Sequence, residues 1–351
     1  MKIIDEITQL TYDDVLCKPG KSLESREHAD VRLGFFGTTL EHPIIPANMD
    51  TISGKEMCAA ILKTGGIAIL HRFMSDKERA KIWYELAKNS NLFISVGVSK
   101  EEIDVVKLLH SEGIRKFCID IAHGHSDKVK EVITLIRDLD KKHNTLSIII
   151  AGNIATAEGF KFLAEAGADV IKVGIGPGSL CTTRIVTGCG VPQLSAVIDI
   201  VNYRDFCASK KYIPIIADGG IKNSGDIVKA LAAGADLVMA GSLFAGCIEA
   251  PGDVFKWKDG TSWKMYRGMA SKDAQVGWKN TDPNLIVPEG ESSLVPLQGS
   301  VSLKIHQLVG GIKSGMSYIG ANTLTNLKNM TIFIKVSNNT VLENGPHGKR
   351  S

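Results

Sequence analysis

The segment AEAGADVIKVG at residues 164–174 returns in altered form as AAGADLVMAG at residues 232–241. In both copies the end of a helical stretch is followed by a glycine turn, an aspartate and a short apolar run. That order is typical of a helix that ends at a glycine and leads directly into a buried strand. A chain that uses the same turn twice is expected to be built from repeated strand–helix units.

Apolar runs of strand length recur eight times, and amphipathic stretches such as residues 75–89, 100–113 and 126–142 separate them. Continuous rather than alternating apolar residues are typical of a parallel sheet covered on both faces. Eight strand–helix units favour a closed (β/α)8 TIM barrel over an open doubly wound sheet, and no GxGxxG follows an early strand. The runs are PIIPA (43–47), GIAIL (66–70), FISVGV (93–98), KFCIDI (116–121), LSIIIAG (146–152), VIKVGI (170–175), PIIADGG (214–220) and LVMAGSL (237–243).

The composition is that of an ordinary folded protein. The 351 residues carry 41 basic and 38 acidic side chains, and a net charge of +3 does not indicate a nucleic-acid binder. No apolar run is long enough to cross a membrane, and the first residues lack the apolar core of a secretory signal. The seven cysteines contain no CxxC, so neither a zinc site nor a disulfide framework is indicated. We expect one catalytic domain over residues 1–351, in a cytoplasmic setting, with neither nucleic acid nor membrane as partner.

Two long intervals interrupt the regular spacing. Residues 176–193 follow the sixth strand, and a polar region at about 250–299 follows the eighth. Both leave the carboxyl ends of strands, where barrel enzymes place their active sites, and long loops in a compact domain are usually functional. We predict an active-site loop and a flap in these two intervals. The chain should then resume with a helix near 300–314 and an apolar run at 331–336.

The active-site loop contains VGIGPGSLCTTR at residues 173–184. Cys181 lies beyond a strand end among glycines and hydroxyl groups, and we interpret it as a nucleophile; the alternative is an inert buried cysteine. Successive amides in such a turn could bind an anion. Exposed carbonyls, with Gly176 and Gly178 as the candidates, could hold a monovalent cation such as potassium.

The last two strand ends carry polar and glycine residues. Asp218 ends the seventh strand in IADGGI, and Gly241 and Ser242 follow the eighth in GSLFAG. These loops are the recurrent phosphate site of such barrels, and an ionised aspartate can accept both hydroxyls of a ribose. The alternative is that both are ordinary strand-to-helix turns. Histidines also follow earlier strands, but they complete no transition-metal ligand set: His71, His123 and His125.

Taken together, the motifs resemble the IMP dehydrogenase/GMP reductase family over nearly the whole chain. The resemblance implies a purine-nucleotide oxidoreductase on a (β/α)8 barrel that uses a nicotinamide cofactor. The motifs that carry it are LTYDDVLCKPGKS (10–22), ANMDT (47–51), DIAHGHS (120–126), AGNIAT (151–156), GPGSLCTTR (176–184), PQLSAV (192–197), IADGGI (216–221), GSLFAG (241–246), YRGMAS (266–271), VPEG (287–290) and HQLVGGIKSGMSYIGA (306–321).

Within the family the chain looks most like GMP reductase. Family dehydrogenases usually carry a pair of CBS modules after the second barrel unit, and residues 88–100 leave no room for them. Their flap holds an Arg-Tyr pair that activates water, and residues 268–290 contain none. ANMDT and HRF (71–73) also resemble reductases, whereas VPEG and LENGPHG (342–348) resemble dehydrogenases. Leu285 and Ile286 stand where many reductases have Tyr-Arg.

We therefore expect NADPH-dependent reduction of GMP to IMP and ammonia. Two alternatives remain, namely an IMP dehydrogenase without CBS modules, which converts IMP to XMP with NAD, and a nucleotide-binding regulator without catalysis. The resemblance implies that Cys181 attacks C2 of the purine, and that Thr183 and Glu289 relay a proton to the departing ammonia.

The resemblance also assigns the binding residues. Asp218 would hold the ribose, Asp120 and Asn153 would face the cofactor, and a potassium ion would lie on the carbonyls of Gly176 and Gly178. A homotetramer is the habit of the family. The phosphate ligands would be Ser179, Gly220, Gly241, Ser242 and Tyr266. The base would be faced by Gly268, Met269, Ala270 and Glu289.

Overall fold

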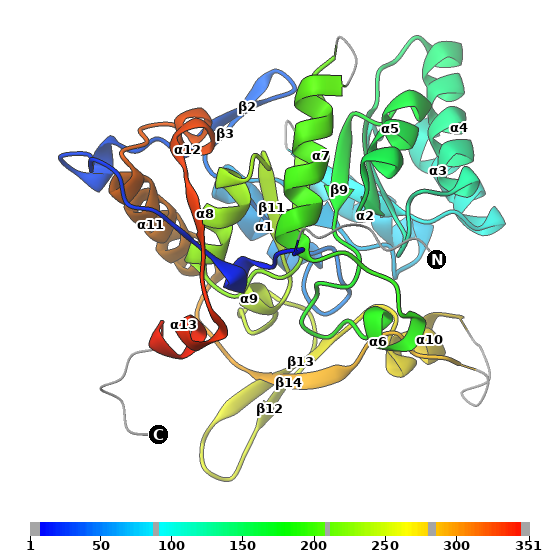
Figure 1. The fold of residues 1–351 in the computed structure, drawn as a ribbon. Helices are drawn as coiled ribbons and strands as arrows, with labels where there is room; N and C mark the ends of the chain where they lie inside the picture. The colour runs from blue at the N-terminus through cyan, green and yellow to red at the C-terminus, as the bar shows by residue number, and fades with distance from the viewer. Residues whose placement is uncertain (1–7, 87–90, 208–210, 280–285, 345–351) are drawn as a thin grey trace.

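The computed structural model describes residues 8–86, 91–207, 211–279 and 286–344. At its centre, eight parallel strands stand in the order β4–β11–β10–β9–β8–β7–β6–β5, and β4 also lies against β5, so that the sheet nearly closes on itself (Figure 1). The predicted (β/α)8 TIM barrel and its eight strands are therefore confirmed. The strands are β4 (Ile44–Pro46), β5 (Ala68–Leu70), β6 (Leu92–Val96), β7 (Lys116–Asp120), β8 (Ile148–Ile154), β9 (Val170–Val173), β10 (Ile215–Asp218) and β11 (Leu237–Ala240).

Helices cover the outside of the barrel, and α11 completes their ring because it packs against both α8 and α1. None of the helices in the described ranges is long and apolar enough to span a bilayer. The covering helices are α1 (Lys55–Lys63), α2 (Asp76–Leu86), α3 (Lys100–Ser111), α4 (Asp127–His143), α5 (Ala157–Ala166), α7 (Gln193–Cys207), α8 (Ser224–Ala232) and α11 (Val301–Ile319). Short helices α6 (Thr183–Thr187) and α9 (Ser242–Ala245) follow β9 and β11.

Local sequence sets where these helices begin and end. The side chains of Ser99, Thr156 and Asn223 each accept a backbone N–H from the first turn of the helix that follows, which satisfies donors that have no partner within the helix. At the other end, Gly167 closes α5 with φ of +105°, a conformation that favours glycine. The predicted helical segments therefore end where their caps require.

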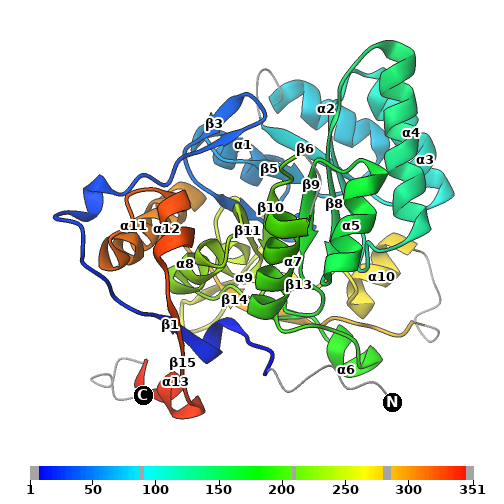
Figure 2. The ribbon, with the colours of Figure 1, turned by 45° about the horizontal axis from the view of Figure 1, so that its top comes forward.

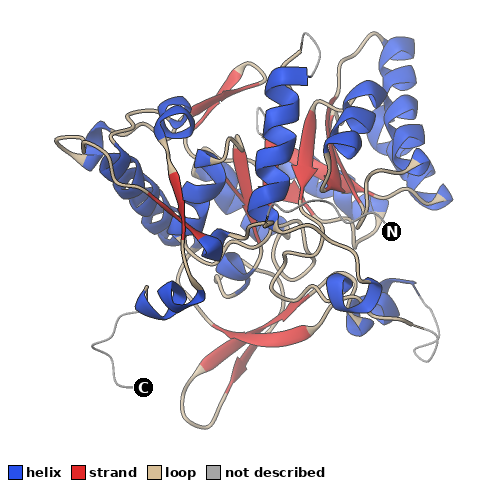
Figure 3. Cartoon of the chain, viewed as in Figure 1, coloured by secondary structure: helices blue, strands red, loops and turns tan. Residues whose placement is uncertain are grey.

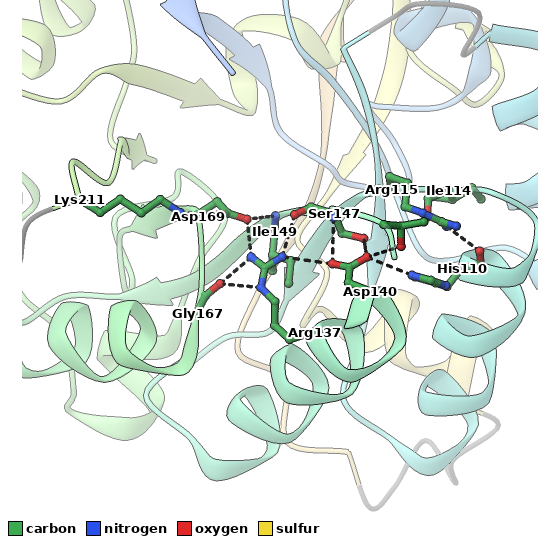
Figure 4. Close-up of polar contacts among 11 residues, drawn as sticks. His110, Ile114, Arg115, Arg137, Asp140, Ser147, Ile149, Gly167, Asp169 and Lys211 are labelled. Atoms are coloured by element: carbon green, nitrogen blue, oxygen red, sulfur yellow. Dashed lines mark hydrogen bonds and ion pairs between the residues drawn. The ribbon is translucent and has the colours of Figure 1, made fainter. Parts of the chain in front are cut away.

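The repeated Gly-Ala-Asp turn clamps the amino ends of the strands. Asp169 Oδ2 accepts the Ile149 N–H at 2.9 Å and Arg137 Nη2 at 2.5 Å (Figure 4). Asp236 Oδ2 accepts in the same way from the first residue of β10 at 2.8 Å and from Arg204 Nη1 at 2.7 Å. Each aspartate thus joins the start of the preceding strand to an arginine of an earlier helix, α4 or α7. The Gly-Ala-Asp motif that predicts the fold therefore also holds the strands to the helices.

Further elements lie outside the barrel, and the sequence did not predict their pairing. β1 (Val15–Cys17) pairs antiparallel with β15 (Phe333–Lys335), so a strand near the start of the described chain lies beside one near its end (Figure 2). β2 (Leu33–Phe35) and β3 (Thr38–Leu40) form a hairpin. The predicted flap is a three-stranded sheet below the barrel mouth together with one helix (Figure 3). Its elements are β12 (Val254–Lys256), β13 (Ser262–Arg267), α10 (Lys272–Lys279) and β14 (Ser292–Pro296). After α11 follow α12 (Leu324–Met330) and α13 (Asn338–Glu343).

A buried histidine beside β4 predicts how stability depends on pH. His42 is 2% exposed, its Nδ1 accepts the Ile44 N–H, and its Nε2 lies 2.9 Å from Thr64 Oγ1. Burial lowers the pKa of His42 to about 4. Between pH 6.5 and 4 the unfolded chain therefore binds a proton that the folded chain excludes, so stability falls as the pH falls. At pH 5 the expected loss from this residue is about 2 kcal/mol.

Urea unfolding at pH 7 and pH 5 measures this loss. His42→Gln keeps a donor and an acceptor but does not titrate, so acidification should destabilise it by less than the parent. His71, whose pKa burial also lowers to about 4, should continue to contribute in both proteins. Equal losses in the parent and in His42→Gln would contradict the assignment to His42.

Candidate active site

The candidate site lies where the carboxyl ends of β7 to β11 meet the flap. Cys181 follows β9 and is partly exposed. Its thiol donates to Thr183 Oγ1 at 3.2 Å, and the Thr183 hydroxyl donates to Glu289 Oε2 at 2.9 Å. The three residues that the resemblance linked in a proton relay therefore lie in one hydrogen-bonded chain that runs from sulfur to carboxylate, although 106 residues separate Thr183 from Glu289.

Backbone pairing fixes the position of Glu289. The Thr182 N–H donates to the Glu289 carbonyl at 3.0 Å, and the Glu291 N–H donates to the Leu180 carbonyl at 2.9 Å. On its other side the same segment pairs with the start of the flap, where the Glu289 N–H donates to the Ala270 carbonyl at 3.0 Å. Residues 289–291 are thus an extended piece between the active-site loop and residues 268–271.

Arg184 folds the active-site loop back on itself. Its Nη2 donates to the carbonyls of Ile175 at 3.2 Å and Val191 at 2.6 Å, so one guanidinium ties the start of the loop to its end. Gly176 has φ of +80°, and an added Cβ there would lie 2.6 Å from the Arg184 side chain. The glycine is therefore needed both for its backbone conformation and for this close approach.

The other cysteines differ from Cys181. Burial raises the pKa of the Cys58 and Cys118 thiols to about 12 and that of the Cys17 and Cys247 thiols to about 11, so these groups stay protonated at neutral pH. Cys189 is exposed and belongs to no hydrogen-bonded relay among the described residues. The Cys207 side chain lies outside the part of the chain that the structure describes. Cys181 is the thiol whose neighbours can take its proton.

Three of the residues assigned to phosphate meet beside β11. The hydroxyls of Ser179 and Tyr266 lie 3.2 Å apart, and an added Cβ at Gly241 would lie 2.7 Å from the Tyr266 hydroxyl. Tyr266 is 5% exposed, and burial raises its pKa, so it remains a neutral donor. Gly220, at φ of +76°, lies over the ring of Tyr12, and Ser242 begins α9. The phosphate assignments themselves stay predictions.

A buried lysine that the sequence reading missed joins two of the assigned aspartates. Lys172 on β9 is 2% exposed, and its Nζ lies 2.8 Å from Asp120 Oδ1 and 3.4 Å from Asp218 Oδ2. Burial alone would lower the pKa of Lys172, but the two carboxylates raise it above its ordinary value; in return, Lys172 lowers the pKa of Asp120 against the effect of burial. The signal was a charged residue inside an otherwise apolar strand.

Asn153 joins the same group. Its Nδ2 donates to Asp218 Oδ2 and to the Gly174 carbonyl, each at 2.8 Å, whereas its Oδ1 is buried without a partner among the described residues. Asp218 therefore receives Asn153 and Lys172 on one oxygen. The structure brings Asp120, Asn153 and Asp218 together from three strand ends, although the sequence reading had divided them between cofactor and ribose.

The residues assigned to the purine base lie at the start of the flap. Arg267 forms an ion pair with Asp50 after β4, and the Met269 sulfur lies 3.4 Å from the Asp50 backbone nitrogen. Gly268 donates its N–H to the Glu291 carbonyl at 2.9 Å. These contacts hold residues 268–270 over the barrel mouth. Leu285 lies outside the described residues, so the role of the pair at 285 and 286 stays a prediction.

The structure gives a hydrogen-bond partner for one of the two carbonyls that are predicted to hold the cation. The Gly178 carbonyl accepts the Cys181 N–H at 3.0 Å, which leaves it one lone pair, and potassium on Gly176 and Gly178 stays a prediction. In the described ranges no three His, Cys, Asp or Glu side chains converge as a metal site would require. His71 Nδ1 accepts the Phe73 N–H at 3.1 Å, and the rings of His123 and His125 lie 6.3 Å apart.

Comparison with known proteins identifies a family and several relatives for this chain. The IMP dehydrogenase / GMP reductase domain matches residues 9–347. Inosine-5'-monophosphate dehydrogenases from Rhodopirellula baltica and Borreliella burgdorferi are 44% and 36% identical to the chain, over 73% and 96% of its length and 47% and 96% of their own. A GMP reductase from Leishmania major is 43% identical over 72% of the chain and 51% of its own length. The chain spans about half the length of most of these curated relatives.

The expectation of an NADPH-dependent GMP reductase is wrong on these comparisons, because most of the similar relatives are named dehydrogenase. The missing insertion does not indicate a reductase, because a relative named dehydrogenase matches the chain over nearly its whole length. In this chain α2 ends at Leu86 and β6 begins at Leu92, yet it matches the Borreliella dehydrogenase over 96% of that protein, whereas about half of the Leishmania reductase lies outside the match. The share of a relative's length that the chain covers therefore does not separate the two activities. The chain belongs to the IMP dehydrogenase/GMP reductase family.

Proposed function

We propose that this barrel oxidises IMP to XMP with NAD. The observation that carries the proposal is the hydrogen-bonded chain from Cys181 through Thr183 to Glu289, since the attack on C2 needs a thiolate and the attack of water needs a proton acceptor at this point. A protein that only bound nucleotides would need neither. The names of the relatives support the oxidation of IMP over the reduction of GMP.

The same relay would act twice. First, Thr183 accepts the thiol proton of Cys181 and passes its own to Glu289, and the thiolate forms a bond to C2 of IMP. After hydride has left C2, a thioimidate joins Cys181 to the purine. Once Glu289 has lost that first proton to solvent, water attacks C2, a proton of the water passes through Thr183 to Glu289, and the C–S bond breaks to release XMP and the thiolate. The overall reaction balances, because IMP and one water give XMP, the hydride that leaves C2 and one proton.

This scheme replaces the one expected from the reductase resemblance. In the reduction of GMP, Thr183 and Glu289 would deliver a proton to the departing ammonia. In the oxidation of IMP, they would remove a proton from water. In family dehydrogenases the resemblance assigns the base to an Arg-Tyr pair of the flap, and this chain has no such pair at residues 268–290. Glu289 fits that task because its carboxylate reaches, through one hydroxyl, the point where the sulfur holds C2. A carboxylate is a weak base at neutral pH, and the hydroxyl relay compensates by positioning the water.

The residues around Asn153 fit a nicotinamide. The buried, unpartnered Oδ1 of Asn153 is an acceptor of the kind that a carboxamide N–H requires, and Asp120 stands on the neighbouring strand end. When bound, the nicotinamide ring supplies the acceptor for the hydride that leaves C2. Lys172 keeps Asp120 ionised and oriented, and Asn153 keeps Asp218 turned toward the barrel mouth.

The nucleotide would be held by Asp218 and by the loops that follow β9 and β11. We assign its ribose hydroxyls to the Asp218 oxygen that Asn153 and Lys172 leave unoccupied. Its phosphate goes to the hydroxyls of Ser179 and Tyr266 and to the backbone at Gly220, Gly241 and Ser242. The base faces Gly268, Met269 and Ala270. A homotetramer is a further part of the proposal that rests on the family resemblance. Potassium rests on the glycine-rich active-site loop, and a cytoplasmic location rests on the wide spacing of the cysteines.

An assay of the purified protein with two substrate pairs tests the function. With IMP and NAD we expect NADH and XMP in equal amounts. With GMP and NADPH we expect no consumption of NADPH above the level without enzyme. Consumption of NADPH with GMP, together with no XMP from IMP and NAD, would overturn the proposal, and so would binding of IMP with turnover of neither pair.

A further inference from the structure

A buried lysine of the flap sheet holds the end of the short helix that follows the last barrel strand. Lys264 on β13 is 2% exposed. Its Nζ donates to the carbonyls of Cys247 and Ile248, each at 3.3 Å, and to that of Ala250. An ammonium group has three N–H bonds, and these carbonyls provide one acceptor for each. The segment 247–250, which follows α9, is thereby fixed to the flap.

Lys264 differs from the other buried basic side chains that the structure describes. Lys172, Arg79 and Arg204 each form an ion pair with an aspartate or a glutamate. Lys264 forms none within the described ranges, and its acceptors are neutral carbonyls. Taking a charge out of water is costly, and an apolar side chain would fill this space without that cost. The lysine is therefore expected to contribute to the neighbouring site and not to stability alone.

The strand matches the helix in length. Burial alternates along β13, so Lys264 and Tyr266 lie on the same face of the strand, and β13 packs against α9 (Figure 1). Two residues along a strand span about 6.8 Å, and the four residues of α9 span about 6 Å. Lys264 therefore holds the carboxyl end of the helix. The Tyr266 hydroxyl lies at its amino end, where an added Cβ on Gly241 would be 2.7 Å away.

The chain between β14 and α11 holds the other side of the same segment. The Gln298 N–H donates to the Gly246 carbonyl at 2.6 Å. The Ile248 N–H donates to the Gly299 carbonyl at 3.3 Å. Segment 247–250 is therefore enclosed on both sides, and the lysine contacts fix how α9 lies on β13.

We propose that Lys264 is a positioning residue for the phosphate of the nucleotide. By fixing the carboxyl end of α9 on β13, it sets the distance from the Tyr266 hydroxyl to the backbone at Gly241 and Ser242, at the other end of the helix. The phosphate is assigned to these groups, so the inference rests on the proposed function. Lys264 touches neither the phosphate nor the reacting atoms, because carbonyls occupy its three N–H bonds.

Binding of IMP and of inosine, which lacks the phosphate, measures this role. In the Cys181→Ala background, which binds without reacting, the dissociation constant for IMP is measured by calorimetry and that for inosine by competition with IMP. We expect IMP to bind at least about 100-fold more tightly than inosine in this parent, since hydrogen bonds to a charged phosphate are strong. Lys264→Met keeps the length of the side chain without a donor. It should reduce this ratio at least about fivefold and change the affinity for inosine less than about twofold.

A second substitution tests how the lysine acts. Tyr266→Phe removes the hydroxyl that Lys264 positions and should itself reduce the ratio about tenfold. In the Tyr266→Phe protein, Lys264→Met should reduce the ratio further by less than about twofold, because the distance to the hydroxyl no longer matters. Full additivity of the two reductions would overturn positioning through Tyr266.

Lys116→Met is the matched control. Lys116 is a partly buried lysine at the start of β7, at the opposite end of the barrel, and its Nζ donates to Asn91 Oδ1 at 3.0 Å. Its substitution should leave the ratio of IMP to inosine affinity at the parent value.

If Lys264→Met does not fold, Lys264→Gln carries the test, because it keeps an NH2 donor without the charge; the ratio should then fall at least about twofold. A ratio at the parent value, whether both affinities fall together or neither changes, overturns the positioning role. A parent that binds IMP no more tightly than inosine overturns the phosphate assignment of the proposed function instead, so the two failures are distinguishable.

Discussion

Replacing Cys181 with alanine is expected to abolish turnover of IMP and NAD, with a loss of at least about 10⁴-fold, because no other described thiol lies in a relay to a carboxylate. The dissociation constant for IMP should change by less than about tenfold, since the hydroxyls of Ser179 and Tyr266 and the carboxylate of Asp218 remain. Initial rates of NADH formation and calorimetric titration with IMP measure the two effects.

The chain offers a matched control for this variant. Cys189 lies eight residues further along and is exposed, and among the described residues its thiol donates only to the carbonyl of Thr187, so Cys189→Ala should keep full activity. If Cys181→Ala kept more than a few per cent of the parent rate, Cys181 would not be the covalent residue. Equal losses in the two variants would point to damage of the loop rather than to a missing nucleophile.

Glu289→Gln should separate the two halves of the reaction. We expect steady-state turnover to fall about 10²–10³-fold, because the amide cannot take the proton of the attacking water. Attack by Cys181 suffers less, since its thiol donates directly to the Thr183 hydroxyl and Glu289 acts on it only through that hydroxyl. The variant should therefore release close to one NADH per active site in a first phase and then almost stop, with the purine still attached to the protein.

Rapid mixing with detection of NADH, followed by intact-protein mass spectrometry, measures both features. Glu291→Gln is the control, because that exposed carboxylate lies on the same extended segment but has no hydrogen bond to Thr183. A Glu289→Gln variant that lost the first phase and the steady state equally, with no nucleotide attached, would rule out Glu289 as the base for hydrolysis.

The barrel was predictable because its information is local. Each strand is a short continuous apolar run, and each helix has its cap and period within a few residues, so neighbouring units can be read one at a time. The pairing of β1 with β15 was not, since both strands have three residues and more than 300 residues separate them. Nothing in three residues specifies a partner at that distance.

Within the site, glycine turns and reactive side chains at strand ends were predictable, and side chains that support them were not. Lys172 was read as part of an apolar strand, and Lys264 only as part of a polar region. Both act through contacts with residues on other elements, which sequence order does not display. The predicted reductase activity is wrong for a related reason. The absence of an insertion and of an Arg-Tyr pair does not show whether Thr183 and Glu289 can relay a proton.

The extended piece at residues 289–291 has a consequence for how the flap can change. Side chains alternate along such a backbone, so a shift of one residue against Leu180 and Thr182 would turn Glu289 away and present Pro288 or Gly290, neither of which has a proton-accepting side chain. The number of residues between α10 and this piece does not enter that register. The flap can therefore lengthen or shorten in its middle without moving the Glu289 carboxylate. A shift of one residue in the pairing of residues 289–291 would instead abolish the proposed activity, although every reactive residue would still be present.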